Sequence, residues 1–226
     1  MPTTLTSQQL ADLLIAVADD MIAGKDELTT LDAELGDGDL GRTISRGFSA
    51  IKDSLTNAEA HESDVGKFLF QQGKLFNNVA PSSFGSLFST ALMTGGKSLR
   101  GTEAASLSAI ADATQAALDT LMERGGAKLG DKTMLDAMNP AIEAMRQILS
   151  EDGEDVAADT FFQAAADAAQ KGAEDTANMQ SQIGRASWQQ GRSAGKMDPG
   201  ARAIAMMLQA AAQHAGRDTD RDTKDN

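Results

Sequence analysis

Apolar residues recur at intervals of three and four along most of this 226-residue chain, and this spacing constrains the fold more than any other feature. Ile44, Phe48, Ile51 and Leu55 form the clearest set. Because residues three and four apart share one face of an α-helix, each such set predicts a helix with one apolar face. Strand formers are scarce, since Val occurs four times and Tyr never, whereas roughly one residue in six is Ala. The sequence therefore predicts an all-α fold.

Capping and turn residues divide the chain into nine helical patterns. Thr6 and Gln9 predict a capping box before the first helix, which Gly24 should end. A short second pattern ends at Gly36, and Ser63 is expected to cap the fourth helix. The last helix is expected to begin with Asp198 as cap and Pro199 in its first turn, and the other patterns cover residues 44–55, 87–99, 102–125, 134–149 and 156–182.

The domain organisation and the cellular setting follow from composition. We expect one domain over residues 1–216 and a disordered tail over residues 217–226, which is charged and has no apolar residue. A net charge of −13 argues against nucleic acid and anionic membranes as partners. The absence of cysteine, of a membrane-length apolar run and of a signal-peptide pattern leads us to expect a cytoplasmic protein.

Three aspartates, Asp32, Asp37 and Asp39, lie between the second and third helical patterns, with Gly36 and Gly38 among them. A helix that ends at Gly36 places Asp32 in its last turn, and glycine turns can bring the other two carboxylates beside it. Carboxylate oxygens are the ligands that Mg²⁺ prefers, and clustered carboxylates repel one another without a cation. The spacing alone leaves two interpretations open, a metal site and a glycine-rich acidic loop between helices.

Two further stretches are candidates for a binding site. Pro81 should end one helix, and Ser82, Ser83 and Gly85 then offer hydroxyls and backbone N–H groups at the next helix N-terminus, where anions are favoured. A plain capping loop is the alternative for this stretch. The segment from Gly184 to Asp198 has no helical pattern, and a loop of this length inside a compact domain is usually functional or disordered.

Four segments, in this order, resemble the nucleotide-binding L-type domain of dihydroxyacetone kinases. They are Leu31–Gly41, Ser82–Phe88, Gly130–Asp136 and Gly184–Ala201. The resemblance implies an up-and-down barrel of eight antiparallel amphipathic helices, with ADP or ATP bound at one end through two Mg²⁺ ions. The nine patterns match this barrel if the short segment before Gly36 is counted with the loop.

The resemblance also implies roles for individual residues. The metal ligands carry over to Asp32, Asp37 and Asp39, which with Arg185 form the expected catalytic set. The phosphate and nucleotide contacts carry over to Ser82, Ser83, Gly85, Thr133, Met134, Arg185, Asp198 and Pro199. The chain departs from the family pattern at Leu40, where relatives usually carry His or Thr, and at Ala80-Pro81, which replaces a glycine pair and is followed by an extra residue at Phe84.

The expected function is that of a kinase subunit. It would transfer a phosphoryl group from Mg-ATP, or from Mg-bound ADP recharged by a phosphotransferase-system protein, to a short hydroxyketone such as dihydroxyacetone or erythrulose. The resemblance implies that a separate K-type subunit holds this substrate, and a homodimer is left open. The alternative is a non-catalytic ADP-binding module that docks to a regulator. All three carboxylates are retained, which favours the kinase.

Overall fold

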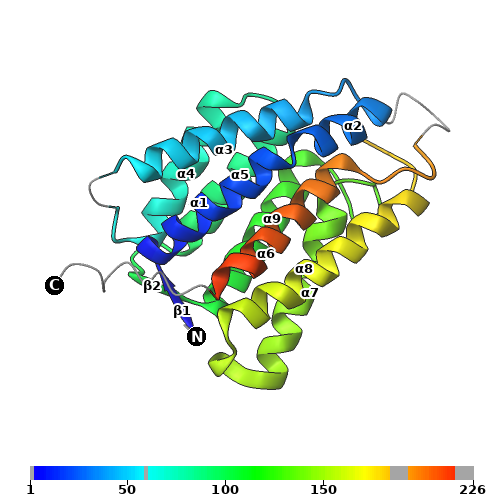
Figure 1. Cartoon of the computed structure of the whole chain (residues 1–226). Helices are drawn as coiled ribbons and strands as arrows, with labels where there is room; N and C mark the ends of the chain where they lie inside the picture. The colour runs from blue at the N-terminus through cyan, green and yellow to red at the C-terminus, as the bar shows by residue number, and fades with distance from the viewer. Residues whose placement is uncertain (1–2, 59–60, 184–192, 217–226) are drawn as a thin grey trace.

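The computed structural model describes residues 3–58, 61–183 and 193–216, and within them the chain is mostly helical, as the sequence predicts (Figure 1). The α-helices of this described part are α1 (Ser7–Ala23), α2 (Lys25–Leu35), α3 (Leu40–Thr56), α4 (Val65–Val79), α5 (Ser83–Ser98), α6 (Leu107–Gly125), α7 (Leu135–Asp152), α8 (Ala158–Asp175) and α9 (Pro199–Ala215). Short 3-10 turns follow α7 (Gly153–Asp155) and α8 (Thr176–Asn178). None of the described helices is both long enough and apolar enough to span a membrane. The predicted tail, residues 217–226, lies outside the described residues.

One element was not predicted. Strand β1 (Thr4–Thr6) pairs with strand β2 (Ala104–Ser106) in an antiparallel ribbon, with Leu5 opposite Ala105. Both of these central residues are buried while their neighbours are partly or fully exposed. The expected helix at residues 102–125 therefore begins only at Leu107, because three-residue strands are too short to show an alternating pattern.

Capping contacts fix most of the helix starts. At α1 the predicted capping box is confirmed, since the Gln9 amide donates to the Thr6 hydroxyl and the Thr6 amide donates to the Gln9 side chain at 2.9 Å. The prediction for α4 was wrong: Asp64, not Ser63, is the cap, because its carboxylate accepts from the Lys67 amide at 2.9 Å. Helix α8 ends at Asp175, earlier than the expected Gln182.

The helices other than α2 pack in a cyclic order. Each of α3 to α8 contacts the next helix along the chain, and α1 contacts both α3 and α9 (Figure 1). Their apolar faces turn inward, where the rings of Phe48, Phe76 and Phe88 lie 4.9 to 5.6 Å apart. Helix α2 stands outside this order and packs on α3, α9 and α1. The helix that carries Asp32 is thus the one least enclosed by its neighbours.

Candidate functional site

The three candidate metal ligands come together at the junction of α2 and α3. Asp32 lies in the last turn of α2, Asp39 is the residue before α3, and Asp37 lies in the connection between them. One carboxylate oxygen from each lies within 4.8 Å of the others, and all three residues are partly or fully exposed. Three hard oxygen donors in this arrangement fit a Mg²⁺ ion, which keeps its remaining positions for water and phosphate oxygens.

Two glycines allow the chain to make this junction. Gly38 has φ of +70°, a left-handed conformation that side chains with a Cβ rarely adopt. A Cβ at Gly36 would lie 2.5 Å from the Asp32 carboxylate, so a side chain there would displace the candidate ligand. The Leu40 amide then donates to the Asp32 carboxylate at 3.1 Å and fixes its orientation. The Leu40 side chain, one departure from the family pattern, is buried at the edge of the site.

A cavity of about 520 Å³ joins the aspartates to the other sequence-predicted segments. It is lined by Asp32, Leu35, Gly36, Asp37, Asp39, Leu40, Pro81, Ser82, Ser83, Phe84, Leu87, Lys132, Thr133, Met134, Ile183, Asp198, Pro199 and Gly200. Nine of the eleven different candidate site residues are therefore in one place. Gly85 is buried behind the wall instead, and Arg185 lies outside the described residues.

The serine stretch forms the start of α5, four residues earlier than expected. Ser82 is the cap, since its hydroxyl accepts from the Gly85 amide at 2.9 Å. Gly85 is required for packing, because a Cβ there would lie 2.0 Å from the Ala80 carbonyl oxygen. Ser83 is exposed in the first turn, and within the described part of the chain its hydroxyl has no hydrogen-bond partner. The remaining amides of this turn and the Ser83 hydroxyl are the groups suited to an anion.

The turn before α7 forms another wall of the cavity, and it depends on two residues to which no role was assigned from the sequence. Asp136 is buried, and its carboxylate accepts from the amides of Gly130 at 2.5 Å and Thr133 at 2.8 Å. Lys132 is only 2% exposed and has φ of +64°, the one positive value among the described non-glycine residues. Both residues belong to a segment that the resemblance singled out, but they occupy no position with an implied role.

The Lys132 ammonium joins the turn before α7 to two other stretches of backbone. It donates to the carbonyl oxygens of Met179 at 3.2 Å and of Ser193 and Lys196 at 2.5 Å each. All three ammonium protons thus have acceptors, which is what a buried cation requires. Burial lowers the pKa of Lys132, and the nearby Asp198 carboxylate opposes this effect.

Asp198 completes this wall at the start of α9. Its carboxylate accepts from the Ala201 amide at 2.7 Å, and Pro199 follows in the first turn, so the predicted cap is confirmed. Burial raises the pKa of Asp198 to about 7, and the charge of Asp136 contributes in the same direction. The site therefore combines a cluster of metal-type ligands with the N-termini of α5 and α9, a combination suited to a phosphate-bearing ligand held with a cation.

The fold and site thus define a mostly helical domain with a candidate centre for a metal and an anion. Residues 34–213 match the family model described as the DAK2 domain. The chain is 30% identical over 206 residues to the Escherichia coli protein named PEP-dependent dihydroxyacetone kinase, ADP-binding subunit DhaL, covering 91% of this chain and 96% of that protein. The chain therefore belongs to the DAK2-domain family, and the predicted resemblance to L-type chains of dihydroxyacetone kinases is confirmed.

Two further comparisons involve longer proteins, of which this chain spans about a third. A D-erythrulose kinase of Mycolicibacterium smegmatis is 36% identical over 191 residues, which cover 84% of this chain and 32% of that protein. The crystal structure of Citrobacter freundii dihydroxyacetone kinase in complex with AMP-PNP and Mg²⁺ matches with a TM-score of 0.68 and 30% identity, over 90% of this chain and 33% of the other.

Proposed function

We propose that this chain is the nucleotide-binding subunit of a dihydroxyacetone-type kinase, and that the cavity holds ADP or ATP with two Mg²⁺ ions. The observation that carries the proposal is the meeting of three carboxylates with two helix N-termini in one cavity. The relative that covers nearly the same length is named an ADP-binding subunit, and the solved relative was crystallised with AMP-PNP and Mg²⁺. The eight-helix up-and-down barrel belongs to the same proposal, and the cyclic order of helix contacts supports it.

Each wall of the cavity has a role in this proposal. Asp32, Asp37 and Asp39 would hold Mg²⁺, which supplies charge neutralisation for the phosphates when it is bound. Ser83 and the first amides of α5 donate to phosphate oxygens, while Ser82 and Gly85 maintain that turn. Thr133, Met134, Asp198 and Pro199 contact the rest of the nucleotide. Arg185 would neutralise charge on the transferred phosphoryl group, and positioning together with charge neutralisation is what phosphoryl transfer mainly requires.

The acceptor would be a short hydroxyketone on a separate K-type subunit. Relatives named dihydroxyacetone kinase and erythrulose kinase support this substrate class, and each is about three times as long as the matched region. The name of the E. coli relative supports a donor cycle in which bound ADP is recharged by a phosphoprotein, whereas the longer C. freundii kinase, crystallised with the ATP analogue AMP-PNP, supports direct use of ATP. Exchange of bound ADP with labelled free ATP distinguishes the two: slow exchange supports recharging, and rapid exchange supports ATP.

The competing function is an ADP-binding module that docks to a regulator without turnover. A coupled assay for ADP release, with dihydroxyacetone and a K-type partner, separates this function from the kinase. The kinase predicts ADP release that depends on all three components, namely the two chains and the hydroxyketone. Tight nucleotide binding without any turnover, across dihydroxyacetone and erythrulose, would favour the module.

A further inference from the structure

Helix α2 carries the metal-ligand candidate Asp32, yet it lies outside the cyclic packing of the other helices. Its main contact is with α3, where Gly41 permits a close approach: a Cβ at Gly41 would lie 2.1 Å from the Lys25 carbonyl oxygen. This contact fixes one side of α2. The position of Asp32 relative to the Asp198–Gly200 wall of the cavity depends on what holds α2 on its other side.

Two ion pairs connect α2 to the segment that contains this wall. Glu34 of α2 pairs with Lys196 at 3.2 Å, and Glu27 pairs with Arg202 at 2.7 Å. Glu27 and Glu34 are seven residues apart, about two helical turns, so they lie on the same face of α2. The cations lie on either side of the Asp198–Gly200 turn in the sequence. The pairs therefore join the metal-ligand helix to both flanks of that turn.

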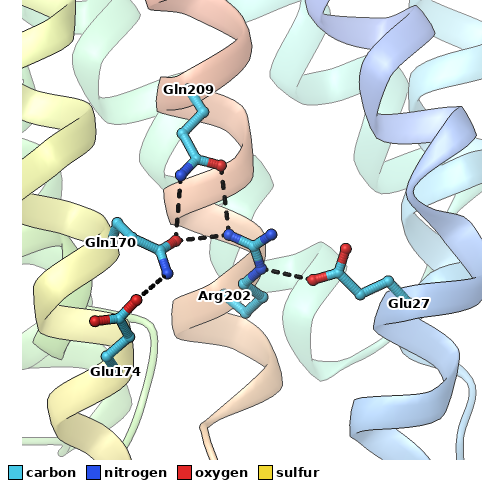
Figure 2. Close-up of polar contacts among 5 residues, drawn as sticks. All are labelled: Glu27, Gln170, Glu174, Arg202 and Gln209. Carbon is cyan, nitrogen blue, oxygen red and sulfur yellow. Dashed lines mark hydrogen bonds and ion pairs between the residues drawn. The ribbon is translucent and has the colours of Figure 1, made fainter.

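The cationic end of the Glu27–Arg202 pair is held in place by other contacts. Figure 2 shows the Arg202 guanidinium between α2, α8 and α9: besides Glu27, it donates to the side-chain oxygens of Gln170 at 2.6 Å and Gln209 at 3.3 Å. Gln170 in turn donates to Glu174 at 2.6 Å. The Arg202 side chain is only 18% exposed. An ion pair with one partner already ordered loses less side-chain entropy than a freely exposed pair, which usually contributes little.

Lys196 is held in place through its backbone. Its carbonyl oxygen accepts from the buried Lys132 ammonium at 2.5 Å, while its own ammonium reaches Glu34. One residue thus connects the turn before α7, the start of the α9 segment and helix α2. Three walls of the cavity are linked through it.

We propose that Lys196 and Arg202 are positioning residues that hold α2 at a fixed distance from the Asp198–Gly200 turn, and so set the carboxylates Asp32, Asp37 and Asp39 relative to the bound nucleotide. This inference rests on the proposed function, because it assigns a role in binding Mg-nucleotide. Neither residue lines the cavity. Each acts on metal binding through the placement of α2.

The test measures the Mg²⁺ concentration for half-maximal nucleotide-induced stabilisation, at a fixed saturating concentration of ADP. The variants are Arg202→Met and Lys196→Met, which remove the cation and keep an unbranched chain. Arg146→Met is the matched control, since it breaks the 3.4 Å Arg146–Asp112 pair between α7 and α6, and neither of these residues lines the cavity. The melting temperature without ligand is measured for each variant.

Each positioning variant should need about fivefold more Mg²⁺, the factor that corresponds to about 1 kcal/mol. The double variant with Glu27→Gln and Arg202→Met should need little more Mg²⁺ than Arg202→Met alone, since both substitutions remove the same contact. Arg146→Met should leave the Mg²⁺ requirement unchanged. An unchanged requirement in both positioning variants, with only a lower ligand-free melting temperature, would show that the pairs merely stabilise the fold and would overturn the inference. Failure of the wild-type protein to respond to Mg-ADP would instead overturn the proposed function.

Discussion

Asp198 serves two purposes at one position, as the cap of α9 and as part of the cavity wall. Burial of its carboxylate raises the pKa to about 7, well above the ordinary value of 3.8. The folded protein therefore binds a proton at this group that the unfolded chain has lost between about pH 4 and 7. For a carboxyl group with a raised pKa, the stabilising contribution is present at low pH and is lost as the pH rises through this range.

Replacing Asp198 with asparagine should remove this pH dependence. Asn keeps an oxygen that can accept from the Ala201 amide, and it caps helices about as well as Asp. For the metal-free protein, the free energy of unfolding of the wild type should fall relative to Asp198→Asn between about pH 4 and 7, by on the order of 2–4 kcal/mol at about 1.4 kcal/mol per pKa unit. Urea titrations at several pH values measure this difference. Parallel profiles for the two proteins would contradict the raised pKa, and the exposed Asp112→Asn serves as control.

At the same scale, the sequence allowed the aspartate cluster to be predicted but gave no role to Lys132 or Asp136. Asp32, Asp37 and Asp39 are close in sequence, so glycine turns suffice to bring them together. The acceptors of the Lys132 ammonium are 47, 61 and 64 residues away. Such a contact depends on the packing of α7, α8 and α9, and no local pattern encodes it.

At the scale of the elements, the start of α5 carries two adjacent serines, one with a structural role and one with a proposed binding role. Ser82→Ala removes the cap and should lower the stability by about 1 kcal/mol, a typical cost for losing a serine cap. Ser83→Ala removes an exposed hydroxyl that makes no hydrogen bond within the described residues, so its melting temperature should match the wild type. Its affinity for Mg-ADP should fall instead. Calorimetry with and without nucleotide tests both, and the assignment fails if Ser83→Ala binds Mg-ADP normally.

The element boundaries also show what the sequence does not contain. The apolar pattern of α5 begins at Leu87, so the first turn, in which Phe84 stands alone among Ser83, Gly85 and Ser86, was missed. The β1–β2 ribbon was missed because each strand has three residues. For α4, two adjacent polar residues were both suitable caps, and Asp64 is used because its carboxylate also accepts from the Gly101 amide at 3.0 Å. The prediction of element boundaries from sequence thus fails where tertiary contacts decide between residues that are equally suitable locally.

At the scale of the whole molecule, the site is built from helix ends that meet at one place. The end of α2, the starts of α3, α5 and α9 and the turn before α7 supply most of the cavity wall. The apolar patterns predict the helices, and the family resemblance predicted which loops belong to the site. The pairing of Lys196 and Arg202 with α2 could not be predicted, because it depends on the position of α2, which packs outside the cyclic order of the other helices.

The proposed function depends on Mg-nucleotide binding at the three aspartates, and the melting temperature of Asp37→Ala tests this binding most directly. A ligand present at 100 times its dissociation constant stabilises the folded protein by about 2.7 kcal/mol, which corresponds to roughly 5–10 °C for a domain of this size. The wild type should gain this shift with Mg-ADP and lose most of it when EDTA removes the metal. Asp37→Ala should remain folded without ligand and gain almost nothing with Mg-ADP. A full Mg-ADP shift in Asp37→Ala would contradict the assignment of the three aspartates as the metal ligands.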